Sequence, residues 1–226
     1  MRIHRLSPHI EALKTWLGIN VTVWLVDEGD GVVLVDGGIA SFEKPIERAL
    51  AGRPLKRIVL THGHLDHTGS VAALAARWKV PVWIHATERP YAEGRVPYPA
   101  RKKAEAFLPV DLAAELPSQG GVLSDIGSLT PHFAPGHSPG HVVYLHRQDN
   151  VLIAGDLFWS HRRRLEAPLF TPDEELAWRS AEVVPRLAPA LLDVCHGWPV
   201  TNPAEDWPRL QAKWRARLDR KKPGRP

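Results

Sequence analysis

The order of the expected elements predicts a layered α/β domain, with β-sheets inside and helices outside. Short apolar runs of strand length alternate with segments of helical spacing along the chain. Two pairs of these strands are expected to form hairpins, one in each half of the sequence. The 226 residues are 44% hydrophobic and 24% charged, which is ordinary for a globular protein that buries a core.

The first half of the chain begins with an expected hairpin. Apolar runs at residues 21–26 and 32–36 flank a turn-forming segment, Asp27-Glu28-Gly29-Asp30-Gly31. Ser41 is a suitable N-cap for a helix over residues 42–51, and a Gly-Arg-Pro sequence ends that helix.

A strand, a helix and a second strand are expected next. Residues 57–61 and 81–85 are short apolar runs, and residues 70–78 show helical spacing of apolar side chains. Residues 86–121 contain several prolines and clustered charges, so we expect a helix-and-loop insertion there and no boundary between domains. Residues 1–226 are therefore expected to form a single domain.

The second half repeats the change from strands to helices. Residues 171–174 combine a proline with two acids, which suits the start of a helix that we expect to reach about residue 187. A last strand over residues 191–195 and a basic helix at about 203–222 close the chain. Three strands are expected earlier in this half, with a hairpin turn at residues 148–150 between the last two: residues 129–134, 141–146 and 151–154.

Composition also limits the compartment. No apolar run is long enough to cross a membrane, and no apolar segment of the secretory type follows the N-terminus. The single cysteine, Cys195, excludes an intramolecular disulfide and fits a reducing compartment. We therefore expect a cytoplasmic protein without a membrane partner.

The net charge is +4, and basic residues are concentrated near the C-terminus. These residues are Lys213, Arg215, Arg217, Arg220, Lys221, Lys222 and Arg225. No nucleic-acid-binding motif accompanies them, so we expect a solvated helix face and no nucleic-acid partner. Trp207 and Trp214 suit either an aromatic interface or a core, which leaves a homo-oligomer open.

One short run carries the chemistry. His62, His64, Asp66 and His67 lie within six residues at the end of an expected strand. Imidazole and carboxylate are good zinc ligands, and imidazole also suits iron and manganese sites. Residues two apart in extended backbone point the same way, so His62 and His64 can share one ion. Asp66 and His67 can face a second ion, which makes a metal site a better interpretation than a histidine-rich surface loop.

This run resembles the signature of the metallo-β-lactamase superfamily, His-x-His-x-Asp-His. Four other motifs of the family are similar to segments found here in the family's order, and the resemblance covers residues 20–197. These segments are Leu34-Val35-Asp36-Gly37-Gly38, Ala134-Pro135-Gly136-His137-Ser138-Pro139-Gly140-His141, Ala154-Gly155-Asp156 and Cys195-His196-Gly197.

The resemblance implies a four-layer αββα sandwich, in which two mixed β-sheets are flanked by helices. It also implies a centre of two divalent metal ions, for which we expect zinc, with iron or manganese as alternatives. By motif, the first ion would be held by His62, His64 and His137, the second by Asp66, His67 and His196, and both by Asp156.

Other motif residues are expected to support these ligands. Asp36 would orient a ligand imidazole or the following loop, although a plain turn aspartate is the alternative. His141 would also act behind the ligands, and Gly136 and Gly140 would let the backbone approach the site. Cys195 precedes a ligand, but successive residues of a strand point to opposite sides, so we do not expect it to bind metal.

The resemblance implies a hydrolase in which a metal-bridging hydroxide attacks a small ester-like substrate. Asp66 would orient the hydroxide and pass a proton to the leaving group. We expect a thioester or a lactone, because the chain leaves little room for an added nuclease domain. The alternatives are a mononuclear iron oxygenase similar to persulfide dioxygenases, a β-lactamase, a phosphodiesterase and a non-catalytic binding module.

The substrate pocket is expected to draw side chains from the insertion and from the loops after strands. A tyrosine could stabilise an oxyanion, and an arginine could attract an anionic small molecule. The candidates are Tyr91, Tyr98, Trp159, His161, Arg162 and Trp198.

Overall fold

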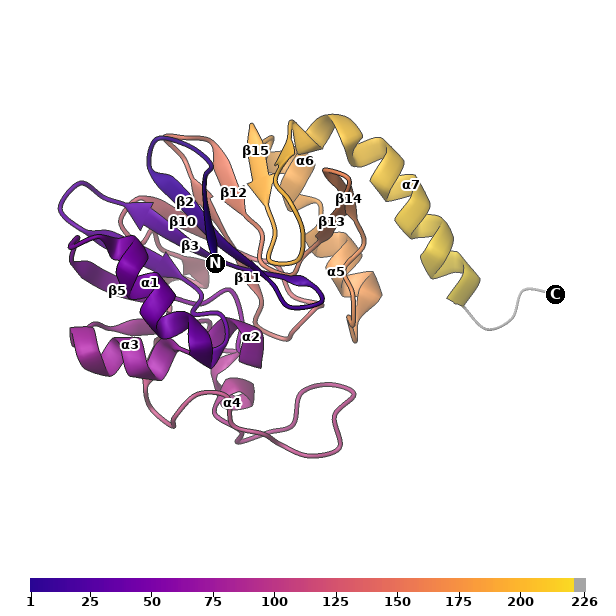
Figure 1. The fold of residues 1–226 in the computed structure, drawn as a ribbon. Helices are drawn as coiled ribbons and strands as arrows, with labels where there is room; N and C mark the ends of the chain where they lie inside the picture. The colour runs from indigo at the N-terminus through magenta and orange to yellow at the C-terminus, as the bar shows by residue number, and fades with distance from the viewer. Residues whose placement is uncertain (222–226) are drawn as a thin grey trace.

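The computed structural model describes residues 1–221, and two β-sheets packed face to face form the centre of the molecule (Figure 1). Helices lie on the outer side of each sheet. The first sheet carries α1 (Glu43–Leu50) and α3 (Val71–Trp78), and the second carries α5 (Glu174–Ser180), α6 (Val183–Leu187) and α7 (Pro203–Lys221). These four layers confirm the expected αββα sandwich.

The first sheet contains seven strands in sequence order, antiparallel from β1 to β4 and parallel from β4 to β7. The central strands β3 and β4 are buried on both faces, because helices cover one face and the second sheet covers the other. This explains their uninterrupted apolar sequences. The strands are β1 (Arg2–Arg5), β2 (Ile10–Trp16), β3 (Asn20–Asp27), β4 (Val32–Val35), β5 (Leu55–Val59), β6 (Val82–Ile84) and β7 (Ala113–Glu115).

The second sheet contains five strands in the order β10-β11-β12-β15-β16, and only the β12–β15 pair is parallel. Strand β11 shows why both faces of this sheet are apolar. Val142 and Tyr144 pack toward the first sheet, whereas Val143 and Leu145 pack toward the helices. The strands are β10 (Leu129–Phe133), β11 (Val142–His146), β12 (Val151–Ile153), β15 (Leu191–Asp193) and β16 (Val200–Thr201).

Short elements connect the layers. Two small hairpins stand apart from the main sheets, and three short helices lie in the loops of the first half. The hairpins are β8 (Ser118–Gln119) with β9 (Val122–Leu123), and β13 (Trp159–His161) with β14 (Arg164–Glu166). The short helices are η1 (Ala40–Phe42), α2 (Leu65–Thr68) and α4 (Arg89–Ala92).

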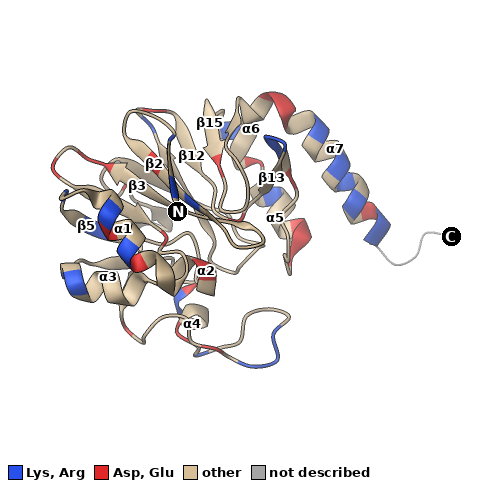
Figure 2. Ribbon diagram, in the orientation of Figure 1, with Lys and Arg blue, Asp and Glu red and all other residues tan. Residues whose placement is uncertain are grey.

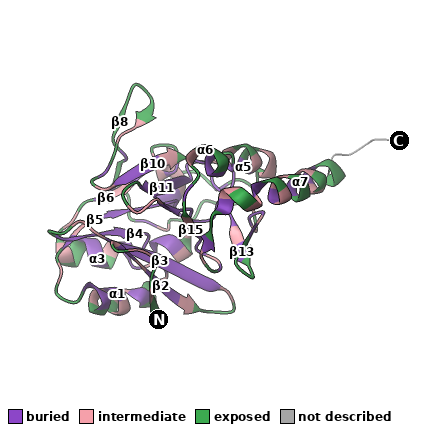
Figure 3. Cartoon of the chain, turned by 90° about the horizontal axis from the view of Figure 1, so that it is seen from above, coloured by how far each residue is buried: buried purple, intermediate pink, exposed green. Residues whose placement is uncertain are grey.

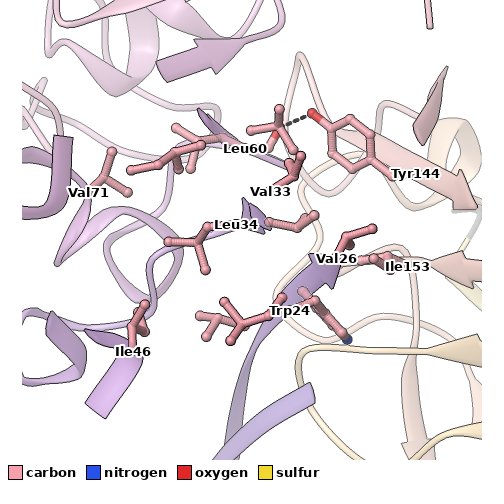
Figure 4. Packing of buried hydrophobic residues seen from close by; sticks show 14 of the residues in the cluster. Trp24, Val26, Val33, Leu34, Ile46, Leu60, Val71, Tyr144 and Ile153 are labelled. Carbon is pink, nitrogen blue, oxygen red and sulfur yellow. Dashed lines mark hydrogen bonds between the residues drawn. The ribbon is translucent and has the colours of Figure 1, made fainter. Parts of the chain in front are cut away.

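Two apolar clusters hold the layers together. The larger cluster fills the space on both sides of the first sheet, where Trp24 and Val26 face Ile153 across the sandwich (Figure 4). Leu34 and Ile46 in the same view belong to the side covered by helices. Burial is concentrated in the strands, and exposure in the outer faces of the helices and the loop tips (Figure 3).

Helix α7 combines a buried apolar stripe with a basic outer face. Trp207 and Trp214 lie in the second cluster, so they are core residues in this chain. Basic residues recur along the helix (Figure 2), and several pair with acids of neighbouring elements, for example Lys213 with Glu166 at 2.6 Å. Lys222 and Arg225 lie outside the described residues. Within residues 1–221, no helix has both the length and the apolar character required to cross a membrane.

Several expected elements differ from the structure. Strands β1 and β2 were not expected, because their sequences mix charged and apolar residues. Ser41 lies inside a 3₁₀ turn, and α1 starts without a side-chain cap. The helix expected from residue 171 to 187 is divided into α5 and α6. The proposed insertion at residues 86–121 also contributes an edge strand, β7, to the first sheet.

A buried polar network joins the two sheets just before His196. The ammonium of Lys14 on β2 lies 2.9 Å from a carboxylate oxygen of Asp193 on β15, and both side chains are almost fully buried. Lys14 also donates to Thr22 Oγ1 at 3.0 Å, and Trp24 Nε1 donates to the other oxygen of Asp193 at 2.8 Å. These bonds satisfy the charges, which would otherwise be costly to bury.

We predict that Asp193→Ala lowers the free energy of unfolding by about 3–5 kcal/mol, because it leaves the Lys14 ammonium buried and unpaired. Urea denaturation measures this change. Asp30→Ala is the matched control, because its ion pair with Lys56 is exposed and should contribute little to stability. Equal losses in the two variants would show that the buried network does not hold the sheets together.

Candidate metal centre

Loops at one end of the sandwich bring the candidate ligands together. In the second sheet, strands β10, β12 and β15 run in the same direction, so their carboxyl ends share an edge. The ligand candidates follow these strand ends and the end of β5: His62 and His64 after β5, Asp66 and His67 in α2, His137 after β10, Asp156 after β12 and His196 after β15.

Three imidazoles form the first group. The Nδ1 atom of His64 lies 2.9 Å from Nε2 of His62 and 3.2 Å from Nε2 of His137. One ligand atom of each residue lies within 4.8 Å of the other two, as a shared ion requires. The structure therefore brings together the residues expected for the first metal, although they come from segments about seventy positions apart.

The second group contains two imidazoles and two carboxylates. Nε2 of His196 lies 3.4 Å from Asp66 Oδ2 and 3.1 Å from Asp156 Oδ2. Nε2 of His67 lies 3.5 Å from the other oxygen of Asp156. Because Asp156 Oδ2 is also 3.4 Å from Nε2 of His137, this carboxylate stands between the two groups.

Hydrogen bonds on the far sides of the rings select the nitrogen that faces the centre. His67 Nδ1 lies 2.7 Å from Asp36 Oδ2, and His196 Nδ1 lies 2.7 Å from the backbone oxygen of Asn20. Carboxylate and carbonyl oxygens only accept, so both rings carry a proton on Nδ1, which leaves Nε2 as the atom that faces the centre and could bind a metal. Such bonds orient metal-binding histidines in proteins.

Two buried atoms at the centre lack hydrogen-bond partners. Among residues 1–221, neither His67 Nε2 nor Asp156 Oδ1 has one, although both are shielded from solvent. Buried polar atoms rarely lack partners, because such an atom loses its hydrogen bonds to water and gains none in the protein. Nitrogen and oxygen donors that converge in this way fit a divalent cation such as zinc.

Burial and charge act differently on the two groups. Burial holds the pKa of His62 well below its ordinary value and lowers that of His64 to about 3, so both rings are neutral at physiological pH. Burial also tends to lower the pKa of His196, but Asp156 outweighs it and raises the pKa well above the ordinary value. The second group therefore favours positive charge, which a dication supplies.

Asp36 and His141 lie directly behind these residues. Asp36 has a positive φ of 60°, and its carboxylate accepts from the backbone N–H and the hydroxyl of Thr61 as well as from His67. Nε2 of His141 accepts the backbone N–H of Asp156 at 3.1 Å. Both residues thus hold segments that bear ligands.

Cys195 lies nearer to the centre than the alternation of a strand suggests. Its sulfur belongs to a group of donor atoms, with Asp66, His67 and His196, that all lie within 4.8 Å of one another. The thiol is fully buried and donates to the backbone oxygen of Thr22 at 3.8 Å. The strand has ended at Asp193, so strict alternation no longer applies at residue 195.

Glu88 is a site residue that the sequence did not reveal. Its fully buried carboxylate accepts four hydrogen bonds, which come from two ligand-bearing loops and from the wall of the cavity. The donors are Gly63 N–H at 3.0 Å, Tyr98 Oη at 2.7 Å, Ser138 Oγ at 2.9 Å and Gly140 N–H at 2.6 Å. Its position in the proline-rich insertion, far from the motifs, gave no signal.

The glycines beside Glu88 permit this close packing. A Cβ atom on Gly140 would lie 2.4 Å from the backbone nitrogen of Glu88, and one on Gly63 would lie 2.4 Å from Tyr98 Oη. Gly136 has a different role from the one expected. A Cβ there would lie 2.3 Å from the backbone of Ala177, so its close approach is to helix α5.

A cavity of about 560 Å³ opens above the ligand candidates. Its walls contain Tyr98 and five of the seven ligand candidates, all except the fully buried His62 and His67, together with apolar groups from the insertion and from the loop before α5. Tyr91 lines a neighbouring hollow that shares His137 with this cavity. The other lining residues are Leu65, Pro99, Ala100, Arg101, Glu105, Phe107, Phe170 and Pro172.

Besides Tyr91, four expected pocket residues do not line this cavity: Trp159, His161, Arg162 and Trp198. The first three belong to the β13–β14 hairpin, whose turn lies at Arg162 and Arg163, where φ is positive. Trp198 packs edge-on against His4, with ring centroids 5.2 Å apart. Sequence proximity to Asp156 and His196 therefore did not indicate proximity to the cavity.

The hydroxyl of Tyr98 is committed to Glu88. Burial, followed by the charge of that carboxylate, raises the pKa of Tyr98 far above its ordinary value, so the phenol keeps its proton. Because this proton is donated to Glu88, Tyr98 does not supply the oxyanion contact expected of a pocket tyrosine.

Known proteins are similar to this chain in sequence. The family model described as the metallo-beta-lactamase superfamily matches residues 16–196. The probable metallo-hydrolase YybB of Bacillus subtilis is 36% identical over 205 residues, which cover 87% of this chain and 91% of that protein. The hydroxyacylglutathione hydrolase GloC of Haemophilus influenzae is 29% identical over 141 residues, covering 59% of this chain and 63% of that protein.

A solved structure supports the fold. The metallo-beta-lactamase family protein TTHA1429 from Thermus thermophilus superposes with a TM-score of 0.72, covering 96% of this chain and 82% of its own. Its sequence identity is 22%, so this likeness concerns the arrangement of the sheets and helices.

We predict that Glu88→Gln weakens metal binding by about 10–100-fold, because Gly63 and Gly140 position loops that carry ligand candidates. Glutamine has one acceptor oxygen in place of two. Its NH₂ group would face the backbone N–H of Gly63 or of Gly140, and the loss of that hydrogen bond should also lower the free energy of unfolding by about 1–3 kcal/mol. Competition with a chelator measures the metal affinity, and urea denaturation the stability. The exposed Glu115→Gln is the control, and wild-type metal affinity in Glu88→Gln would contradict the prediction.

Proposed function

The chain belongs to the metallo-β-lactamase superfamily, and we propose that it is a hydrolase with two divalent metal ions that cleaves a small thioester or lactone. The observation that carries this proposal is the convergence of seven nitrogen and oxygen donors, with His67 Nε2 and Asp156 Oδ1 buried and without hydrogen-bond partners among the described residues. Zinc suits this donor set best, and iron and manganese are alternatives.

The two groups of side chains would divide the ions between them. His62, His64 and His137 would hold one, and Asp66, His67 and His196 the other, with Asp156 in contact with both. Ions bound there would lower the pKa of a water molecule and polarise the substrate's carbonyl oxygen.

Asp66 is the residue placed to handle protons. Unlike His62 and His67, its side chain is partly exposed, and it lines the cavity. Burial tends to raise its pKa, but the neighbouring His67 and His196 outweigh this and lower the pKa, so the carboxylate is ionised at neutral pH. It can therefore orient an attacking water, accept a proton and return that proton to the leaving group.

The cavity walls support a small acyl substrate. Leu65, Phe107 and Phe170 supply apolar surface, and Arg101 forms an exposed ion pair with Glu105, at 3.9 Å, at the side of the cavity. This combination suits an acyl chain whose other part is polar. The name of the relative GloC, a hydroxyacylglutathione hydrolase, supports a thioester of this kind. The cytoplasmic location stays a prediction.

We predict about two equivalents of zinc, or of zinc with iron or manganese, in protein purified without added metal or chelator. Elemental mass spectrometry measures this, and a panel of thioesters, lactones, β-lactams and phosphodiesters then tests the substrate class. Removal of metal by a chelator should abolish hydrolysis, and added zinc should restore it. One equivalent of iron, with dioxygen uptake on a thiol persulfide, would replace the hydrolase by an oxygenase. A folded chain that takes up no metal would contradict the proposal altogether.

We predict that Asp66→Asn lowers kcat by about 10²–10⁴-fold, because an amide cannot accept the proton. The folded state should be little affected, since the Asp66 side chain is partly exposed. Metal content is measured on the same sample, because Asp66 is also a proposed ligand. Asp125→Asn, an exposed change outside the cavity lining, is the control. An Asp66→Asn protein with full metal and wild-type turnover would remove this role.

A further inference from the structure

We propose that His9, His146 and Asp149 form a separate zinc site, which ties the two sheets together. Two imidazoles and one carboxylate are a common ligand set for zinc with an open fourth position. One ligand atom of each residue lies within 4.8 Å of the others, as in the centre described above. No family motif includes these residues, and the site is independent of the proposed function.

The three residues meet at the opposite end of strand β11 from the candidate metal centre. His9 precedes β2 of the first sheet, His146 ends β11, and Asp149 lies in the turn between β11 and β12. His141 adjoins β11 at the end next to Asp156, five residues before His146. Five residues of extended chain span roughly 16 Å, so the new site cannot share an ion with the first.

The distances between donor atoms suit a tetrahedral ion. Asp149 Oδ1 lies 2.8 Å from His9 Nδ1 and 3.7 Å from His146 Nδ1. Zinc bonds of about 2.0–2.1 Å place tetrahedral ligand atoms about 3.3 Å apart, between these two values. The separations at the first centre run over a similar range, from 2.9 Å for His62 and His64 to 3.8 Å for His67 and Asp66.

The cluster is buried on one side and open on the other. The side chains of His146 and Asp149 are 1% and 4% exposed, whereas that of His9 is 34% exposed. His9 and His146 also line a hollow of about 720 Å³, whose walls include Asp27, Glu28 and Asp30. An ion can therefore enter past His9, where the acids at the entrance are paired with Lys56, Arg53 and Arg57.

Few bonds must change when zinc binds. His9 Nδ1 now donates a hydrogen bond to Asp149 Oδ1, and the ion would take the place of that proton, with the neutral ring then carrying its single proton on Nε2. His146 Nδ1 would exchange the backbone N–H of Asp149, at 3.2 Å, for the ion. The backbone N–H of His9, which donates to Asp149 Oδ2 at 3.0 Å, already holds the carboxylate in position.

Zinc at this position would stabilise the fold. His9 belongs to the chain entering the first sheet, and the other two ligands belong to a hairpin of the second sheet. A ligand that binds only the folded chain raises its stability according to its concentration relative to Kd. If the site binds zinc, Tm should therefore continue to rise when zinc is added beyond the concentration that saturates the first centre.

The test compares the full chain with His9→Ala, chosen because His9 is the most exposed ligand. Both proteins are stripped with a chelator, and zinc is then added while bound zinc and Tm are recorded. We expect wild type to bind one more zinc ion than His9→Ala, and the rise in Tm at excess zinc to be lost in the variant. His161→Ala, which removes an exposed histidine elsewhere, should behave as wild type.

Two measurements distinguish a zinc site from a purely structural role of His9. The loss of the hydrogen bonds of His9 lowers Tm with and without zinc, whereas loss of the site removes only the increment that depends on zinc. When the first centre is saturated with zinc, His9→Ala should hydrolyse substrate at the wild-type rate. The comparison of zinc content tests the second site even if the first centre proves to have no hydrolase activity. Equal zinc content and equal zinc-dependent rises in Tm for wild type and His9→Ala would overturn the proposal.

Discussion

The carboxylate of Asp156 lies between 3.1 and 3.5 Å from the Nε2 atoms of three imidazoles, and one of its oxygens has no hydrogen-bond partner among residues 1–221. Burying His67 Nε2 and Asp156 Oδ1 without hydrogen-bond partners within the described residues costs free energy, which a bound cation would repay. The surrounding structure must hold the donors in place against this cost. Much of what is unusual in the fold, from the positive φ of Asp36 to the close packing at Gly140, serves that requirement.

Two buried carboxylates do most of this positioning. Asp36 gathers the backbone and hydroxyl of Thr61 with the imidazole of His67, and Glu88 gathers the loops that carry Gly63 and Gly140. Each satisfies several donors at once, so its charge is hydrogen-bonded although it is buried. Glu88 also accepts the hydrogen bond of the Tyr98 hydroxyl, so this hydroxyl does not donate to the substrate. Beside the ligand candidates, the cavity therefore offers apolar surface and the Arg101–Glu105 ion pair, and the proposed ions would supply the electrophile.

The sandwich also joins its sheets at points that lie far apart. Near the candidate centre, Lys14 of the first sheet pairs with Asp193 of the second, two residues before Cys195 and three before His196. At the other end of β11, His9 meets Asp149 across the same interface. Polar pairs at both ends fix the relative position of two sheets whose central contacts are apolar and less directional. This fixed relation matters because the ligand candidates come from both sheets.

The sequence by itself determined the fold class and grouped the ligand candidates, because these depend on local patterns. His62, His64, Asp66 and His67 are close in the chain, and the motifs around His137, Asp156 and His196 could be recognised one at a time. The tertiary structure alone decided which residues surround them. The positions of Glu88 and of the cluster of His9 with Asp149 depend on contacts between distant segments. Trp198 was expected in the substrate pocket but does not line the cavity, because the direction of a loop next to a ligand cannot be read from the sequence. Periodicity records which face of an element is buried, but it does not record which loops meet at the end of a sheet.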